Sequence, residues 1–225
     1  MLDYRLIRSN RKTIAIHILK DAAVEVRAPL RASKAVIDEF VASKQDWIRT
    51  HRAARERRVQ QKAAFELRYG DAVSVQGTRC PIEAKAGSRA GFDGQRFFLP
   101  PGLPPEEIKR AVIAVYRLVA KNVLTRKAAD YAQRTGLLPA AVKINGAKTR
   151  WGSCSGKNSV NFSWRLMMAD DATIDYVVAH ELAHIREHNH SDRFWAIVAS
   201  AMPDYKERRA ALRELQKRLE VEDWE

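Results

Sequence analysis

The sequence predicts an α+β protein, with an antiparallel β-rich N-terminal region over residues 1–101 and a mostly helical domain over residues 102–225. Short apolar and β-branched runs recur before residue 100, whereas later segments show apolar residues at helical spacing. The proline-rich stretch at residues 100–105 separates the two patterns. With 225 residues, of which 46% are hydrophobic, the chain has enough apolar side chains for a packed core.

The first elements are predicted as strands. Residues 13–18 and 23–26 are expected to form a hairpin, with a third strand over residues 4–8. Ser33 can then cap a helix that continues to about residue 48. The apolar residues of that helix recur at helical spacing and are Val36, Ile37, Phe40, Val41, Trp47 and Ile48.

A basic tract over residues 49–58 follows this helix and contains five arginines. We interpret it as a solvated helix face that leads into a linker; the alternative is a surface that binds anions or nucleic acid. No aromatic pattern interleaves these arginines, which weakens the alternative. The whole chain has 40 Lys+Arg against 27 Asp+Glu, a net charge of +13, which would attract nucleic acid, nucleotides or acidic proteins.

Three strand-like runs, at residues 72–75, 80–84 and 96–99, are expected to join the N-terminal hairpin in one antiparallel sheet. Glu106 and Glu107 then begin a long helix that extends to about residue 135.

The C-terminal part begins with two strand-like runs, at residues 142–144 and 159–164. Three helices are expected after them, one from Asp171 and two over residues 191–201 and 204–218. We find no internal repeat.

The cellular location is expected to be cytoplasmic, with no membrane partner, because no apolar stretch approaches the roughly 20 residues that span a bilayer. Only two cysteines occur, Cys80 and Cys154, and their spacing indicates neither a disulfide framework nor a cysteine-based zinc site.

Residues 180–190 read HELAHIREHNH. Residues four apart lie one above the other on a helix, so His180 and His184 can present two imidazole nitrogens to one zinc ion. Glu181 lies about 100° around the helix, a position that suits a general base acting on water rather than a ligand. Apolar residues upstream predict that this helix is buried, and a cation would satisfy its buried polar groups. The alternative is an exposed polar helix end.

A hydrolytic zinc site usually takes three protein ligands. The candidates for the third are His188, His190, Glu187, Asp204 and Glu207. His188 would lie about 12 Å from His180 along the helix axis, too far for both to bind with His184. We favour His190, provided that the helix ends near His188 and the chain turns back with Asn189 in a left-handed conformation.

The chain resembles a known family through six segments. They read TRWGSCS (149–155), NFSWRL (161–166), IDYVVAHELAH (174–184), NHS (189–191), FW (194–195) and MPDY (202–205). The series looks like the YgjP-like metal-dependent hydrolases, which are related to the WLM and SprT-like metallopeptidases. The resemblance implies a zincin catalytic domain with a short sheet beside the HExxH helix. It also implies one zinc ion bound by His180, His184 and His190, with Glu181 as the catalytic glutamate.

The WGSCS segment is similar to that of the family and is expected near the substrate cleft. Arg150, Trp151, Ser153 and Arg165 are candidate cleft residues, although packing of Trp151 and a tight turn at Gly152 explain the segment equally well. Cys154 is expected to be a small buried residue. The candidates for stabilising an oxyanion are His188, Arg186, Tyr205 and Arg165.

The leading functional hypothesis is peptide hydrolysis, in which zinc activates water and Glu181 acts as general base. A second hypothesis, implied by the same resemblance, is a metal-dependent nucleoside triphosphate (UTP) pyrophosphatase; a Walker-type loop and a carboxylate cluster for magnesium are absent from the sequence. A third is a non-enzymatic nucleic-acid-binding module with a structural zinc. The expected partners are a peptide or protein, or a nucleoside triphosphate, with nucleic acid as a further candidate for the basic surface.

Overall fold

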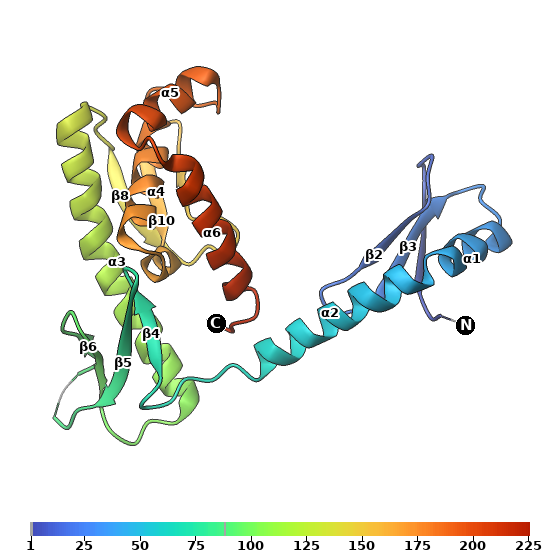
Figure 1. Cartoon of the computed structure of the whole chain (residues 1–225), viewed down its shortest axis with the longest axis horizontal. Helices are drawn as coiled ribbons and strands as arrows, with labels where there is room; N and C mark the ends of the chain where they lie inside the picture. The colour runs from blue at the N-terminus through green and yellow to red at the C-terminus, as the bar shows by residue number, and fades with distance from the viewer. Residues whose placement is uncertain (1, 88) are drawn as a thin grey trace. The chain divides into compact units, whose positions relative to one another are not determined.

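The protein has the predicted α+β class in a computed structural model that describes residues 2–87 and 89–225 (Figure 1). It forms two compact units. Unit 1 contains the chain up to Phe65 together with Glu220–Asp223, and unit 2 contains Glu66–Leu219 and Trp224–Glu225. The units therefore divide at residue 65, whereas the composition of the sequence suggests a division after residue 101.

Unit 1 packs two helices, α1 (Lys34–Ser43) and α2 (Gln45–Ala63), against a sheet of β1 (Arg5–Ser9), β2 (Ala15–Ile18) and β3 (Val24–Pro29). The hairpin of β2 and β3 forms as predicted. The third strand, β1, pairs in parallel with β3, so the sheet order is β1-β3-β2 and the sheet is mixed. The buried core comprises Val24, Val26, Ala28, Ile37, Val41 and Ile48.

The predicted helix cap is present, because the Ser33 side chain accepts a hydrogen bond from the backbone N–H of Val36. The single helix expected here is instead two, which are interrupted at Lys44. The arginine tract continues as helix in α2, and Ile48 is the buried residue of that helix. The tract therefore lies on an exposed helix.

The second sheet belongs to unit 2 and has the order β4-β5-β7-β6. Its strands are β4 (Ala72–Val75), β5 (Thr78–Ala84), β6 (Gly91–Phe92) and β7 (Phe97–Leu99). The prediction of one antiparallel sheet shared with the N-terminal hairpin is wrong, because the two sets of strands form separate sheets and β5 pairs in parallel with β7. Apolar alternation predicts strands, but it does not choose their partners.

The second sheet folds with the helical residues that follow it. The Tyr116 hydroxyl, on helix α3 (Pro105–Thr135), donates a hydrogen bond to the backbone oxygen of Ser74 at 2.6 Å. The backbone N–H of Gln76 donates to the carbonyl of Met167 at 2.8 Å. The rings of Phe97 and Tyr116 are 5.1 Å apart. These contacts place residues 66–101 in unit 2.

A third sheet lies beside the helix that carries the HExxH sequence. Its strands β8 (Ala141–Asn145), β10 (Ser159–Ser163) and β9 (Gly152–Cys154) are paired in that order, with β9 antiparallel at one edge. Helix α3 contacts β8, and α4 (Asp171–Ala183) contacts β9 and α3 (Figure 1). The expected short sheet beside this helix is therefore present.

Two more helices, α5 (Asp192–Ala201) and α6 (Tyr205–Leu219), also pack on α4. Both predicted C-terminal helices are confirmed. Cys80 and Cys154 are free thiols. Across residues 2–87 and 89–225, no helix has the length and apolar character needed to cross a membrane.

Candidate metal centre

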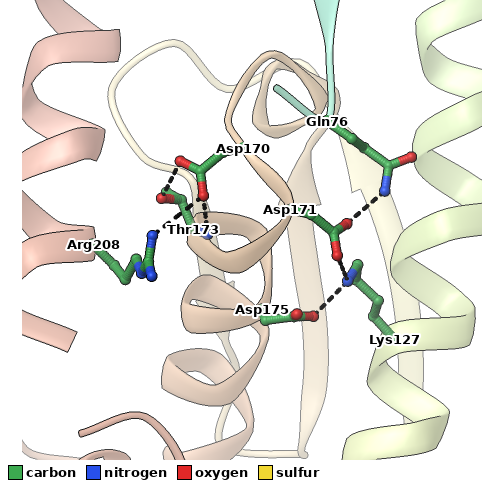
Figure 2. Close-up of polar contacts among 7 residues, drawn as sticks. All are labelled: Gln76, Lys127, Asp170, Asp171, Thr173, Asp175 and Arg208. Atoms are coloured by element: carbon green, nitrogen blue, oxygen red, sulfur yellow. Dashed lines mark hydrogen bonds and ion pairs between the residues drawn. The ribbon is translucent and has the colours of Figure 1, made fainter. Parts of the chain in front are cut away.

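The first turn of α4 is held by side chains from three neighbouring elements (Figure 2). Asp170 caps the helix by accepting hydrogen bonds from Thr173, and Arg208 of α6 approaches the Asp170 carboxylate at 3.5 Å. Gln76, in the turn between β4 and β5, donates to Asp171 at 2.6 Å. These contacts fix the helix that carries His180 and Glu181 against the rest of unit 2.

Lys127 of α3 is the third side chain that holds the first turn of α4, and we call this set of contacts the α4 clamp (Figure 2). Its ammonium donates to Asp171 at 2.9 Å and to Asp175 at 2.6 Å, and its side chain is only 12% exposed. Burial alone would lower the pKa of Lys127, but the hydrogen bonds to Asp175 and Asp171 outweigh it and hold the pKa above its ordinary value. The ammonium is therefore charged at neutral pH and joins α3 to α4.

Replacing Lys127 with methionine is expected to reduce the free energy of unfolding by about 1 to 2 kcal/mol. The substitution keeps the aliphatic stem but leaves two neighbouring carboxylates without their shared cation. Urea denaturation measures the change. Lys217→Met is the matched control, because Lys217 pairs with Glu214 while both side chains are about 70% exposed. A loss no larger than that of the control would contradict a clamp at Lys127.

The HExxH helix ends one turn earlier than the sequence suggested. α4 stops at Ala183 with His184 as its C-cap, and the predicted end near His188 is wrong. The expected left-handed conformation at Asn189 is also absent. The chain reverses through hydrogen-bonded turns that follow Ala183, and Ser191 then caps α5 by accepting from the N–H of Phe194.

This reversal brings three histidines together. One ring nitrogen from each of His180, His184 and His190 lies within 4.8 Å of the other two, and Nε2 of His190 is 3.2 Å from Nε2 of His180. The Phe194 ring packs against all three imidazoles, with centroid distances from 4.4 to 4.9 Å. Three imidazole nitrogens at this spacing fit a divalent cation such as zinc.

The electrostatics of the site keep two of these histidines uncharged. Burial is the main reason that the pKa of His180 is lowered to about 3, and the neighbouring His184 and His190 contribute to the same shift. Burial is also the main reason that the pKa of His184 lies below its ordinary value. Both rings are therefore neutral at pH 7, which is the form that binds a metal ion.

Two contacts orient the imidazoles. The Tyr176 hydroxyl lies 3.3 Å from Nδ1 of His180, and the backbone oxygen of Glu187 lies 3.1 Å from Nδ1 of His184. A proton on each Nδ1 would leave each Nε2 free to bind a cation. Tyr176 is not among the site residues predicted from the sequence, although its position four residues before His180 on the same helix is a usable signal.

Replacing Tyr176 with phenylalanine is expected to weaken metal binding about tenfold, because loss of such a hydrogen bond frees the ring and tautomer of the ligand. Competition with a chromophoric chelator measures the dissociation constant. Tyr131→Phe is the control, because the buried Tyr131 hydroxyl has no hydrogen-bond partner within the described residues. Equal affinities for wild type and both variants would rule out an orienting role for Tyr176.

Glu181 is buried beside the edge strand β9. A Cβ atom on Gly152 would lie only 2.5 to 2.7 Å from atoms of the Glu181 side chain, so the strand approaches closely because residue 152 is glycine. Burial raises the pKa of Glu181 to about 8, and the positive charge of Arg150 counteracts part of this rise. The site thus holds a carboxyl group that exchanges its proton near neutral pH.

The candidate cleft residues are placed differently from one another. Arg150 is exposed and electrostatically coupled to Glu181, whereas Trp151 and Ser153 are half-buried on or beside β9. Arg165 is buried and donates to the backbone oxygens of Gly146 and Trp224. We therefore assign Arg165 to anchoring the C-terminal segment and keep the other three as cleft candidates.

The alternative ligands do not join the histidine cluster, which contains His180, His184 and His190. Glu187 contacts His184 through its backbone oxygen, and Asp204 pairs with Arg208 at 2.8 Å. Tyr205, a candidate for stabilising an oxyanion, is linked to the histidine cluster through Trp195. Its ring stacks on Trp195, and Trp195 stacks on His190.

A buried helix with paired histidines, a returning third histidine and an adjacent edge strand is the arrangement expected of a metallopeptidase domain. The chain matches the family model described as YgjP-like, metallopeptidase domain, over residues 12–215, and it belongs to this YgjP-like family. Membership supports hydrolase activity and implies a metal, for which the three histidines offer a site.

Among solved structures, the chain is similar to the crystal structure of the metallopeptidase zymogen of Pyrococcus abyssi abylysin. The two chains are 18% identical, and the match covers 44% of this chain and 98% of the other, with a TM-score of 0.38. No curated protein matches the chain.

Proposed function

We propose that the protein is a zinc-dependent peptidase in which His180, His184 and His190 hold one zinc ion and Glu181 is the general base. The observation that carries the proposal is the convergence of three imidazoles within 4.8 Å, one residue along the chain from a buried glutamate. Three protein ligands leave a coordination position for water or substrate, as catalytic zinc sites require.

Zinc held by these histidines would polarise the scissile carbonyl and acidify the attacking water. Glu181 removes a proton from that water and returns it to the leaving amine. Its place beside the histidines suits both steps, because a bound cation would favour the ionised carboxylate, which can accept a proton from water and return it. Apolar surroundings from Phe194 limit the access of competing water.

The edge position of β9 supports a peptide as substrate. Within the described residues, this strand pairs with β10 on one side only. Backbone hydrogen bonds of Trp151 and Ser155 face β10, so the alternate residues Gly152 and Cys154 point their backbone groups to the open side, where an extended peptide can bind. We expect the exposed Arg150, whose charge acts on Glu181, to contact the substrate. The nucleoside triphosphate hypothesis has no comparable support from the site and becomes an outcome of the test.

The test compares substrates and histidine variants. Zinc-loaded protein is incubated with casein and fluorogenic peptides in one series and with nucleoside triphosphates in another. Peptide cleavage is expected, with loss of bound zinc and activity in His190→Ala. His188→Ala is the matched control for zinc content, because His188 is exposed and lies outside the cluster.

Three outcomes would overturn the proposal. The first is phosphate or pyrophosphate release without peptide cleavage, which would assign the pyrophosphatase activity. The second is stoichiometric zinc with no hydrolysis of either substrate class. The third is full zinc content in His190→Ala, which would exclude that residue as a ligand.

A further inference from the structure

Unit 1 contains a basic groove that the proposed peptidase site does not use. The groove lies between α2 and β2 and has a volume of about 580 Å³. No acidic residue among those described lines it. The polar residues that line it are His17, Lys20, Arg27, His51, Arg55 and Arg58.

One wall of the groove is a single face of α2. Trp47, His51 and Arg55 follow one another at intervals of four residues, and Arg58 follows three residues later. Residues at these intervals share one face of a helix. The row extends about 16 Å along the helix axis. It therefore presents an aromatic ring at one end and two guanidinium groups at the other.

Trp47 is unusual in this position because 42% of its surface is exposed. The neighbouring Ile48 is buried in the core of unit 1, so the core does not require the indole. The Trp47 ring stacks on His51, with the centroids 4.1 Å apart. An exposed aromatic stack between cationic side chains is the combination by which proteins bind the bases and phosphates of a single strand.

The charges of the groove are only weakly neutralised by the protein. Arg27 pairs with Glu25 at 2.8 Å, and Arg58 pairs with Glu220 at 3.4 Å with both side chains about half exposed. Arg55 donates to the backbone oxygen of Lys20 through Nε. The exposed Arg58–Glu220 pair contributes little, and a phosphate can replace it, whereas Arg27 is held by the buried Glu25.

We propose that this groove binds single-stranded nucleic acid, with Arg55 and Arg58 contacting phosphates and Trp47 stacking on a base. A membrane surface fits the groove less well, because α2 has one buried residue and lacks the apolar face of a membrane-binding helix. The inference extends beyond the proposed peptidase function and uses none of the three clustered histidines.

The experiment measures how tightly the full chain binds labelled DNA and RNA oligonucleotides of about 12 nucleotides, by the fluorescence anisotropy of the label. Single-stranded and duplex forms are compared between about 50 and 200 mM salt. Arg55→Ala/Arg58→Ala is expected to weaken single-strand binding at least about tenfold and to reduce the salt slope by about 1.4. The matched control is Arg49→Ala/Arg52→Ala, which removes the same charge from residues of α2 outside the groove. Its effect is expected to stay below about threefold.

Trp47 provides a second, independent test. Trp47→Leu is expected to weaken single-strand binding about tenfold and to leave duplex binding unchanged, whereas Trp47→Phe retains most of the affinity. Circular dichroism checks that each variant folds, and unchanged peptide hydrolysis separates this inference from the peptidase proposal.

Absence of binding at low salt, or an equal loss of affinity in the two double-arginine variants, would overturn the inference. An unaltered single-strand affinity in Trp47→Leu would overturn it as well. If polyglutamate displaced the labelled strand as well as unlabelled nucleic acid does, the ligand of the groove would be an acidic polypeptide instead.

Discussion

Glu181→Gln is expected to lower the turnover of peptide hydrolysis by about 10²- to 10⁴-fold while zinc stays bound. Glutamine has nearly the same shape as glutamate, so the helix and the three histidines keep their positions. It cannot accept the proton of the attacking water or deliver one to the leaving amine. Steady-state kinetics on a fluorogenic peptide, together with the zinc content of the purified variant, measure both parts of this prediction.

Glu187→Gln serves as the control, because Glu187 lies in the same segment but contacts His184 through its backbone oxygen. Its turnover is expected to match that of the wild type. If Glu181→Gln retained wild-type turnover, another group would have to carry the proton. If the variant lost its zinc, the lower activity would report metal binding rather than proton transfer.

The second large effect is expected from Gly152→Ala, which should reduce turnover about 10- to 100-fold without unfolding the protein. The added methyl group would lie 2.5 to 2.7 Å from Cγ, Cδ and Oε1 of Glu181. These atoms belong to the end of a side chain, which moves more easily than the backbone of β9. The carboxyl group is therefore displaced from its working position. Turnover and the thermal unfolding temperature together measure the effect.

Gly156→Ala is the matched control for this substitution. Gly156 lies in the turn after β9, and a Cβ atom there would meet no atom within 4 Å. Near-normal turnover is expected for this variant. Wild-type turnover in Gly152→Ala would show that the Glu181 side chain can shift and still transfer the proton. A large fall in unfolding temperature would show that strand β9 moves instead of the side chain.

Much of the candidate site was predictable from local sequence. His180, Glu181 and His184 follow helical spacing, and the apolar residues around them predicted a buried helix. The choice of His190 depended on the chain turning back, and the structure brings this residue to the cluster by a different route, because α4 ends at Ala183. Helix ends depend on caps and on tertiary contacts, so their positions are the least predictable part of a helix.

The placement of Arg165 illustrates a further limit. The sequence places it close to the TRWGSCS segment, yet its guanidinium is buried against backbone oxygens of residues 146 and 224. Residue type indicates that an arginine can bind an anion or a carbonyl group. Only the packing around the side chain decides which group it meets.

By itself, the sequence determined the α+β class, the extent of the longest helix, the presence of the N-terminal hairpin, and the residue types of a metal site. These features follow from periodicity and spacing, which act over a few residues. Tertiary structure alone decided that residues 66–101 fold with the helical unit, that three described strand pairs are parallel, and that Gly152 lies against Glu181. Such outcomes depend on contacts between segments distant in the chain, and the free energy of those contacts is not encoded in any local pattern.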